Sequence, residues 1–184
     1  SGTKYGPVDC SVTTAHKEIR CGTAAGVGRD HRWVVTRDSL TSVMSSAFSS
    51  YAAPSIDSNG LSGDAMSAAG TDTRGDSSIT IRGQNFGPDG SASVVVEYGP
   101  AGNPAQYTAK NCAVKDGGHD TIACDTVPGI GKDLFWTVRI GGQYSVRSDQ
   151  KSKYRAPTIN RDGLSGDAMS AAGTDTRGDS SITI

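Results

Sequence analysis

Four cysteines have the spacing that most directly suggests chemistry. Cys10 and Cys21 are 11 positions apart, and Cys112 and Cys124 are 12 apart. Cysteines that end adjacent strands can bring their Cα atoms to the ~5.5–6 Å that a disulfide needs, and so short a loop contributes roughly 2–3 kcal/mol. A metal site needs four converging ligands, whereas each pair has one histidine nearby. We therefore predict the disulfides Cys10–Cys21 and Cys112–Cys124, rather than free thiols or a metal site, and an oxidising, extracellular setting.

A short tripeptide supplies the candidate binding residues. Arg74-Gly75-Asp76 and its second copy, Arg177-Gly178-Asp179, are similar to the motif that integrins recognise. Three letters recur by chance, and an aspartate that caps a turn before a strand accounts for the motif as well. The two copies are therefore weak candidates for binding.

Two polar runs and two histidines are candidates for metal binding. Asp57-Ser58-Asn59-Gly60 and Asn160-Arg161-Asp162-Gly163 offer oxygens of the kind that calcium binds. Because the rest of a calcium loop is absent, we expect polar turns. His16 and His119 each precede the strand with the second cysteine of a pair, and we expect surface turn residues there rather than ligands or pH switches.

Catalytic patterns are missing from the sequence. It has no Gly-x-Ser-x-Gly elbow, no phosphate-binding loop and no distinctive carboxylate pair. We predict a protein that is not an enzyme and needs no cofactor. There is no Asn-x-Ser/Thr sequon, while the Ser- and Thr-rich segments 39–50 and 62–78 leave room for O-linked sugar.

Composition favours a β protein. The chain has 184 residues with a formal charge of −1, and it contains 23 Val and Ile against 4 Leu. β-branched residues favour strands. Without a basic cluster or a long apolar run, nucleic-acid binding and membrane insertion are not expected. The start, with no initiator Met or signal segment, is typical of a mature piece or a fragment.

An internal repeat organises the chain. Residues 60–81 and 163–184 are identical over 22 letters, at an offset of 103. The same offset relates Cys21 to Cys124, Trp33 to Trp136 and Tyr51 to Tyr154, and an offset of 102 relates Tyr5 to Tyr107 and Cys10 to Cys112. About 103 residues is the size of a β-sandwich module. We predict the C-terminal part of a module at 1–52, a complete module at 53–157 and the N-terminal part of another at 158–184.

Short alternating runs predict the strands of the complete module. They are separated by Gly, Asp, Asn and Pro, as in a sandwich. The expected strands cover 78–83, 92–98, 107–114, 120–124, 134–140 and 144–148.

The motifs of these runs resemble the IPT/TIG domain. Their order follows the family's Pro-x-Ile, Gly-x-Asn-Phe-Gly, Cys…Ile-x-Cys, Pro-Gly-x-Gly, Gly-Gly-Gln-x-Ser and Tyr-x-x-Pro pattern, at 54–56, 83–87, 112–124, 128–131, 141–145 and 154–157. The resemblance implies tandem immunoglobulin-like β-sandwiches. The chain departs from the family in the partial module, where 24–28 lacks the Pro and 38–42 replaces Gly-Gly-Gln-x-Ser, and in the long segment 61–77.

Trp33 and Trp136 occupy equivalent strand positions. A tryptophan there could stack on a carbohydrate, but we expect core aromatics packed across the sandwich.

These observations favour a structural protein at the cell surface or outside the cell, the building block of a fibre, appendage or adhesin. The alternatives are a receptor or adhesin module that recognises a protein or glycan ligand by its loops, and an accessory domain of an enzyme. The expected partners are other copies or neighbouring modules, arranged head-to-tail, and glycans. We also expect Ile182-Thr183-Ile184 to pair as a strand with another copy of the chain or with its continuation.

Overall fold

The computed structural model describes residues 4–91, 94–115, 117–170, 177–178 and 180–184. Apart from two single-turn 3₁₀ helices, η1 (Asp64–Met66) and η2 (Asp167–Met169), the regular structure of these residues is β. The predicted all-β class is therefore confirmed. None of the helices in the described part of the chain has the length and apolar character of a membrane span.

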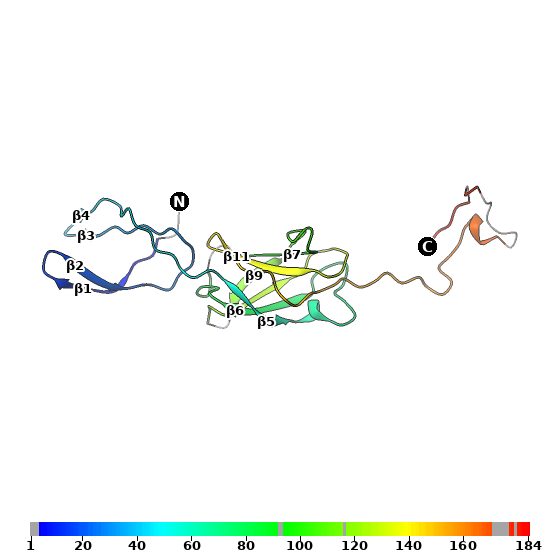
Figure 1. Cartoon of the computed structure of the whole chain (residues 1–184). Coiled ribbons are helices and arrows are strands. Elements are labelled where there is room, and N and C mark those ends of the chain that lie inside the picture. The colour runs from blue at the N-terminus through cyan, green and yellow to red at the C-terminus, as the bar shows by residue number, and fades with distance from the viewer. Residues whose placement is uncertain (1–3, 92–93, 116, 171–176, 179) are drawn as a thin grey trace.

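Two four-stranded antiparallel sheets form the central part of the molecule (Figure 1). The first has the order β5-β6-β10-β9, with β5 (Ser55–Ser62), β6 (Ser78–Gln84), β10 (Thr121–Asp125) and β9 (Lys110–Lys115). The second has the order β12-β11-β7-β8, with β12 (Gln143–Tyr144), β11 (Phe135–Ile140), β7 (Val95–Gly99) and β8 (Tyr107–Thr108).

Alternate residues of both sheets meet in one core. Trp136 of β11 is fully buried and stacks on Tyr98 of β7, with ring centroids 4.2 Å apart. From the first sheet, Ile79 and Ile81 of β6 and Ile122 of β10 are at most 1% exposed. The period-two alternation of these strands therefore places apolar residues inward, as expected when one face of a sheet is covered.

The two polar runs fold differently from one another. The run 160–163 is a turn, in which the Gly163 N–H donates to the Asn160 carbonyl at 2.9 Å. The turn predicted at Asp57–Gly60 is wrong, because these residues belong to β5, whose register against β6 shifts between Ile56 and Leu61. The irregularity accommodates the polar residues within the strand, and a side chain at Gly60 would collide with the carbonyl of Arg82.

Other expected boundaries also differ from the structure. The predicted strand 107–114 is interrupted at Ala109, where the chain passes from β8 in one sheet to β9 in the other. The predicted strand 144–148 is reduced to β12, and residues 92–93 of the predicted strand 92–98 lie outside the described residues. The segment 61–77 is more than a loop: it contains η1, and Ala65 and Thr71 are buried.

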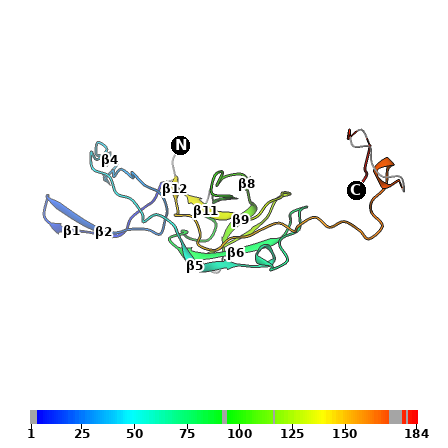
Figure 2. The ribbon, with the colours of Figure 1, turned by 45° about the vertical axis from the view of Figure 1, so that its right-hand side comes forward.

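The two ends of the chain lie on opposite sides of this central part in both views (Figures 1 and 2). At one end, β1 (Val8–Thr14) pairs with β2 (Glu18–Gly22), and β3 (Thr36–Arg37) pairs with β4 (Leu40–Thr41). At the other end is η2. We call residues 4–52 the head segment, 53–157 the central module and the described part of 158–184 the tail segment.

Candidate functional site

Both predicted disulfides are confirmed. Cys10–Cys21 joins β1 to β2, and Cys112–Cys124 joins β9 to β10. They indicate an oxidising, extracellular-type environment. Among the residues that the structure describes, no three His, Cys, Asp or Glu side chains are grouped so that they could hold a metal ion.

The head segment repeats the hydrogen-bond framework of the central module around its tryptophan. Trp136 Nε1 donates to Ser152 Oγ at 3.0 Å, and Trp33 Nε1 donates to Ser49 Oγ at 2.9 Å. The Trp136 and Trp33 backbone N–H groups donate to serine hydroxyls at 3.0 and 2.9 Å. Serine hydroxyls thus satisfy donors where β12 and β4 are too short to continue pairing.

A contact between a tyrosine hydroxyl and a distant backbone carbonyl is repeated in the same way. Tyr107 Oη donates to the Ile130 carbonyl at 2.9 Å, and Tyr5 Oη donates to the Val27 carbonyl at 3.0 Å. A second tyrosine follows in each copy: Tyr154 Oη donates to the Val127 carbonyl, and Tyr51 Oη to that of Ala24. Positions related by the sequence offset therefore have equivalent contacts.

The two copies differ in burial. Trp33 is 41% exposed although Trp136 is fully buried, so the prediction of a core residue holds for Trp136 and is wrong for Trp33. Trp136 is covered by Tyr98, whose ring stacks on its indole. Other exposed apolar residues of the head segment correspond to buried ones: Val12 to Val114, Ile19 to Ile122, and Val35 to Val138.

The tail segment repeats the start of the central module. Ser181 Oγ donates to Asp167 Oδ2 at 3.2 Å, as Ser78 Oγ donates to Asp64 Oδ2 at 2.9 Å. Ser165 bridges to Thr183, which reproduces the pairing of Ser62 with Thr80. The apolar residues are again uncovered: Leu164, Ile182 and Ile184 are 38%, 50% and 75% exposed, whereas Leu61, Ile79 and Ile81 are at most 4% exposed.

A close backbone contact joins the head segment to the central module. Gly28 lies so near Gly141 that a Cβ on Gly141 would stand 2.6 Å from the Gly28 Cα. Gln143 Nε2 donates to the Tyr51 carbonyl at 3.1 Å, and Asn85 Nδ2 donates to the Ala53 carbonyl at 3.1 Å. We call this contact region the junction.

An apolar side chain completes the junction. Val27 is half-buried against the core of the central module, and a Cβ on Gly87 would collide with its Cγ1. The residue equivalent to Val27 in the central module is Ile130, which is 72% exposed. The central module therefore exposes, at the equivalent position, an apolar side chain like the one that the head segment buries in the junction.

The first Arg-Gly-Asp copy is engaged within the module. Arg74 donates two hydrogen bonds to Asp72, at 3.1 and 3.0 Å, and these hold the pKa of the Asp72 carboxyl well below its usual range. Gly75, at φ +85°, packs against the backbone of 127–128, and Asp76 pairs with Lys110. Both charged side chains thus have internal partners. In the second copy, Arg177 and Gly178 lie in an exposed turn, and Asp179 lies outside the described residues.

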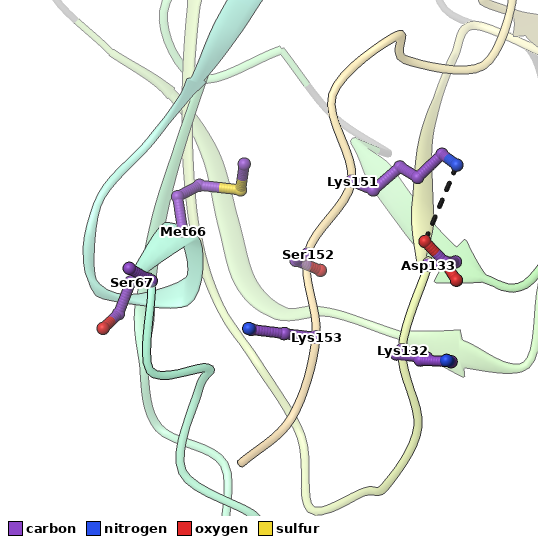
Figure 3. Close-up of a pocket in the computed structure, with 8 residues that line it drawn as sticks. Met66, Ser67, Lys132, Asp133, Lys151, Ser152 and Lys153 are labelled. Atoms are coloured by element: carbon purple, nitrogen blue, oxygen red, sulfur yellow. Dashed lines mark ion pairs between the residues drawn. The ribbon is translucent and has the colours of Figure 1, made fainter. Parts of the chain in front are cut away.

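Lysines surround a depression of about 430 Å³ beside η1 (Figure 3). Lys151 pairs with Asp133 at 3.6 Å, and Lys132 and Lys153 form no ion pair within the described residues. Figure 3 shows Lys153 extending toward Met66 and Lys132 extending in the opposite direction. The ammonium groups do not converge, so the depression lacks the focused charge that holds an anion.

The histidines are turn residues, as predicted. His16 and His119 are exposed and adopt left-handed backbone angles, with φ +59° and +74°. His119 also borders a groove of about 410 Å³ at the junction, whose other lining residues include Tyr51 and Asn85.

Comparisons with protein-family models, curated proteins and solved structures give no match to this chain.

Proposed function

We propose that this protein is a structural component of an extracellular or cell-surface array. In this array, IPT/TIG-like immunoglobulin-type sandwiches stack end to end and build a fibre, appendage or adhesin. The observation that carries the proposal is the junction, because it fixes two copies of one framework against each other through backbone and side-chain contacts.

The contacts of the junction favour a stiff rather than a flexible connection. Gly28 and Gly141 have no side chains, which allows their backbones to touch. The hydrogen bonds from Gln143 and Asn85 hold the residues that connect the two parts of the chain, near Tyr51 and Ala53. Because no long flexible linker separates the two parts, the orientation of one module fixes the orientation of the next, as a fibre requires.

The exposed Ile130 supports continuation of the same geometry. Its equivalent, Val27, is half-buried in the junction. A Val or Ile at this position gives each module an apolar side chain that can pack against the next module. Disulfides within each framework suit such an array, because they stabilise modules that have thin cores outside the cell.

The experiment is a glycine substitution at the junction. Gly141→Ala should loosen the connection, because its Cβ would overlap Gly28. Gly142→Ala is the matched control: it too is a glycine with positive φ, +79° against +55°, but its Cβ would meet no atom within 4 Å. Small-angle scattering and limited proteolysis at 51–54 should show a broader set of orientations and faster cleavage for Gly141→Ala alone. Equal behaviour of the two variants would contradict a junction held by this contact.

A further inference from the structure

We propose that the outer face of the second sheet binds an acidic polysaccharide, a chain of sugars that carries carboxylate or sulfate groups. The inference goes beyond the proposed function, because such binding needs a central module and no array. Its basis is an uneven distribution of charge. Of the 18 Lys and Arg, six lie within 132–155, whereas only two of the 19 Asp and Glu do. This part of the central module is therefore basic in a chain that is otherwise acidic, and it attracts anionic ligands.

Three of these cations lie on the outer face of β11 and β12. Arg139 and Tyr144 are directly opposite each other in this strand pair, and strand alternation puts Phe135 on the same face. The Arg147 guanidinium lies over the Phe135 ring, 4.4 Å from its centroid, and the Lys151 ammonium lies 5.0 Å from the same centroid. The Arg139 guanidinium lies 5.6 Å from the centroid of the Tyr144 ring. We call Arg139, Arg147 and Lys151 the basic strip.

The protein neutralises little of the charge on the basic strip. Arg139 and Arg147 form no ion pair within the described part of the chain, and Lys151 has one partner, Asp133, at 3.6 Å. Glu97 shares this face but belongs to β7, on the side of β11 away from β12. The aromatic rings hold the cations in place without cancelling their charge, so less conformational entropy is lost when an anionic ligand binds.

The depression beside η1 extends the basic strip (Figure 3). Lys151 belongs to both, and Lys132 and Lys153 also line the depression. Their ammonium groups point in different directions in Figure 3. This divergence is unfavourable for one small anion, but it suits a polymer that carries its charges at intervals along the chain.

The head segment repeats the cation–aromatic contact with the two residue types exchanged. The Arg32 guanidinium lies over the Phe48 ring, 4.6 Å from its centroid. By the offset of 103, Arg32 corresponds to Phe135 and Phe48 corresponds to Lys151. The same place in each framework therefore carries a cation on an aromatic ring, although the residues themselves differ. A polymer that binds both places gains affinity, because the first contact raises the effective concentration for the second.

Tyr144 favours a polysaccharide over an acidic peptide as the ligand. Its side chain is 58% exposed beside the basic strip. An exposed aromatic ring can stack on the apolar face of a sugar while the neighbouring cations bind the acidic groups. The two disulfides indicate an extracellular-type environment, in which cell-surface polysaccharides are available as ligands.

Binding measurements on the full 184-residue chain test the proposal. The probes for isothermal titration calorimetry are heparin for sulfate groups, alginate for carboxylate groups and dextran as the neutral polymer. Wild type should bind heparin and alginate with an affinity that falls as salt is added, and it should not bind dextran. The double substitution Arg147→Gln and Lys151→Gln should weaken binding by roughly 10-fold, because two exposed cations are lost.

The matched control is the double substitution Arg82→Gln and Lys115→Gln. It removes the same charge from exposed positions of β6 and β9, in the other sheet, and should change the affinity by less than about twofold. All four side chains are exposed, so circular dichroism should show both double variants folded. Equal losses in the two double variants, or a folded wild type that binds neither heparin nor alginate, would overturn the proposal.

A substitution at Tyr144 tests the class of ligand. Tyr144→Ala should weaken alginate binding severalfold and leave the binding of poly-glutamate, which has carboxylates but no sugar, unchanged. Tighter binding of poly-glutamate than of either polysaccharide would assign the face to an acidic protein segment and overturn the proposal. The junction substitutions test the proposed function independently of these measurements.

Discussion

The head segment and the central module have the same polar framework and opposite burial. Each has a disulfide across two neighbouring strands, a tryptophan whose indole donates to a serine, and a pair of tyrosines that donate to backbone carbonyls. Yet Trp33 is 41% exposed and Trp136 is fully buried. The difference shows which contacts are local and which depend on residues far apart in the sequence.

Local contacts form wherever the residues that make them are present. The serine and tyrosine hydrogen bonds in the head segment span at most 27 positions, so they need no distant strand. Burial is different, because Tyr98 and the strands β5 and β6 precede the residues they cover by tens of positions. The shared hydrogen bonds are therefore local contacts, whereas burial of the central core depends on residues from distant strands.

The largest expected effect separates the two tryptophans. Trp136→Ala should destabilise the central module by roughly 3–5 kcal/mol, because it removes a fully buried side chain from the core. Trp33→Ala should change the same unfolding transition by less than about 1 kcal/mol. Denaturant unfolding followed by circular dichroism measures both. Similar losses for the two variants would mean that Trp33 is buried in solution and that the contrast between the segments is wrong.

The disulfides give the next largest contrast. Replacing Cys112 and Cys124 with alanine should cost the central module roughly 2–3 kcal/mol, since the unfolded chain gains the freedom of the opened loop. Replacing Cys10 and Cys21 should leave that transition in place and speed hydrogen exchange in β1 and β2. Non-reducing peptide mapping provides the control, and a cross-link such as Cys10–Cys124 would refute the pairing within each framework.

The buried tyrosine pair gives the smallest expected effect. Tyr98 Oη and Tyr154 Oη are 2.7 Å apart, and burial raises the pKa of both phenols above the usual value. Tyr154→Phe removes these hydrogen bonds and should cost about 1–2 kcal/mol, whereas the half-buried Tyr51→Phe should cost less.

The pH dependence of unfolding follows from the same pair. Because the folded state holds the phenol protons more tightly than the unfolded state, the stabilisation is complete below about pH 10, the ordinary tyrosine pKa, and falls as the pH rises above it. Unfolding measured from neutral to alkaline pH should show this decline in wild type and a shallower decline in Tyr154→Phe. An identical pH dependence in wild type and Tyr154→Phe would show that the tyrosine pair does not cause the decline.

The sequence predicts the features that depend on local pattern. Alternation of apolar residues placed β6, β10 and β11 within one or two residues of their observed limits, and cysteine spacing predicted both disulfides. The repeat also placed Trp136 in the core. These predictions succeed because strand alternation and short-range disulfides depend on residues that are close together in the sequence.

Features that depend on distant residues were not predictable in the same way. Asp57–Gly60 has the composition of a turn, but the residues on either side, Ile56 and Leu61, pair with β6 and keep it within a strand. The contact of Gly28 with Gly141 joins residues more than a hundred positions apart, and the available signal was only that the repeat preserves a glycine at 28 and 131. The exposure of Trp33 was also not predicted, because its position in the repeat, equivalent to the buried Trp136, predicts burial.

Electron microscopy of the native protein tests the central claim most directly. The account predicts filaments whose subunits repeat at a regular axial spacing of one module, with neighbouring modules held in a constant orientation by the junction. Discrete particles with variable angles between modules and no axial repeat would contradict a structural array, and would instead favour a receptor-type ectodomain that recognises a ligand by its loops.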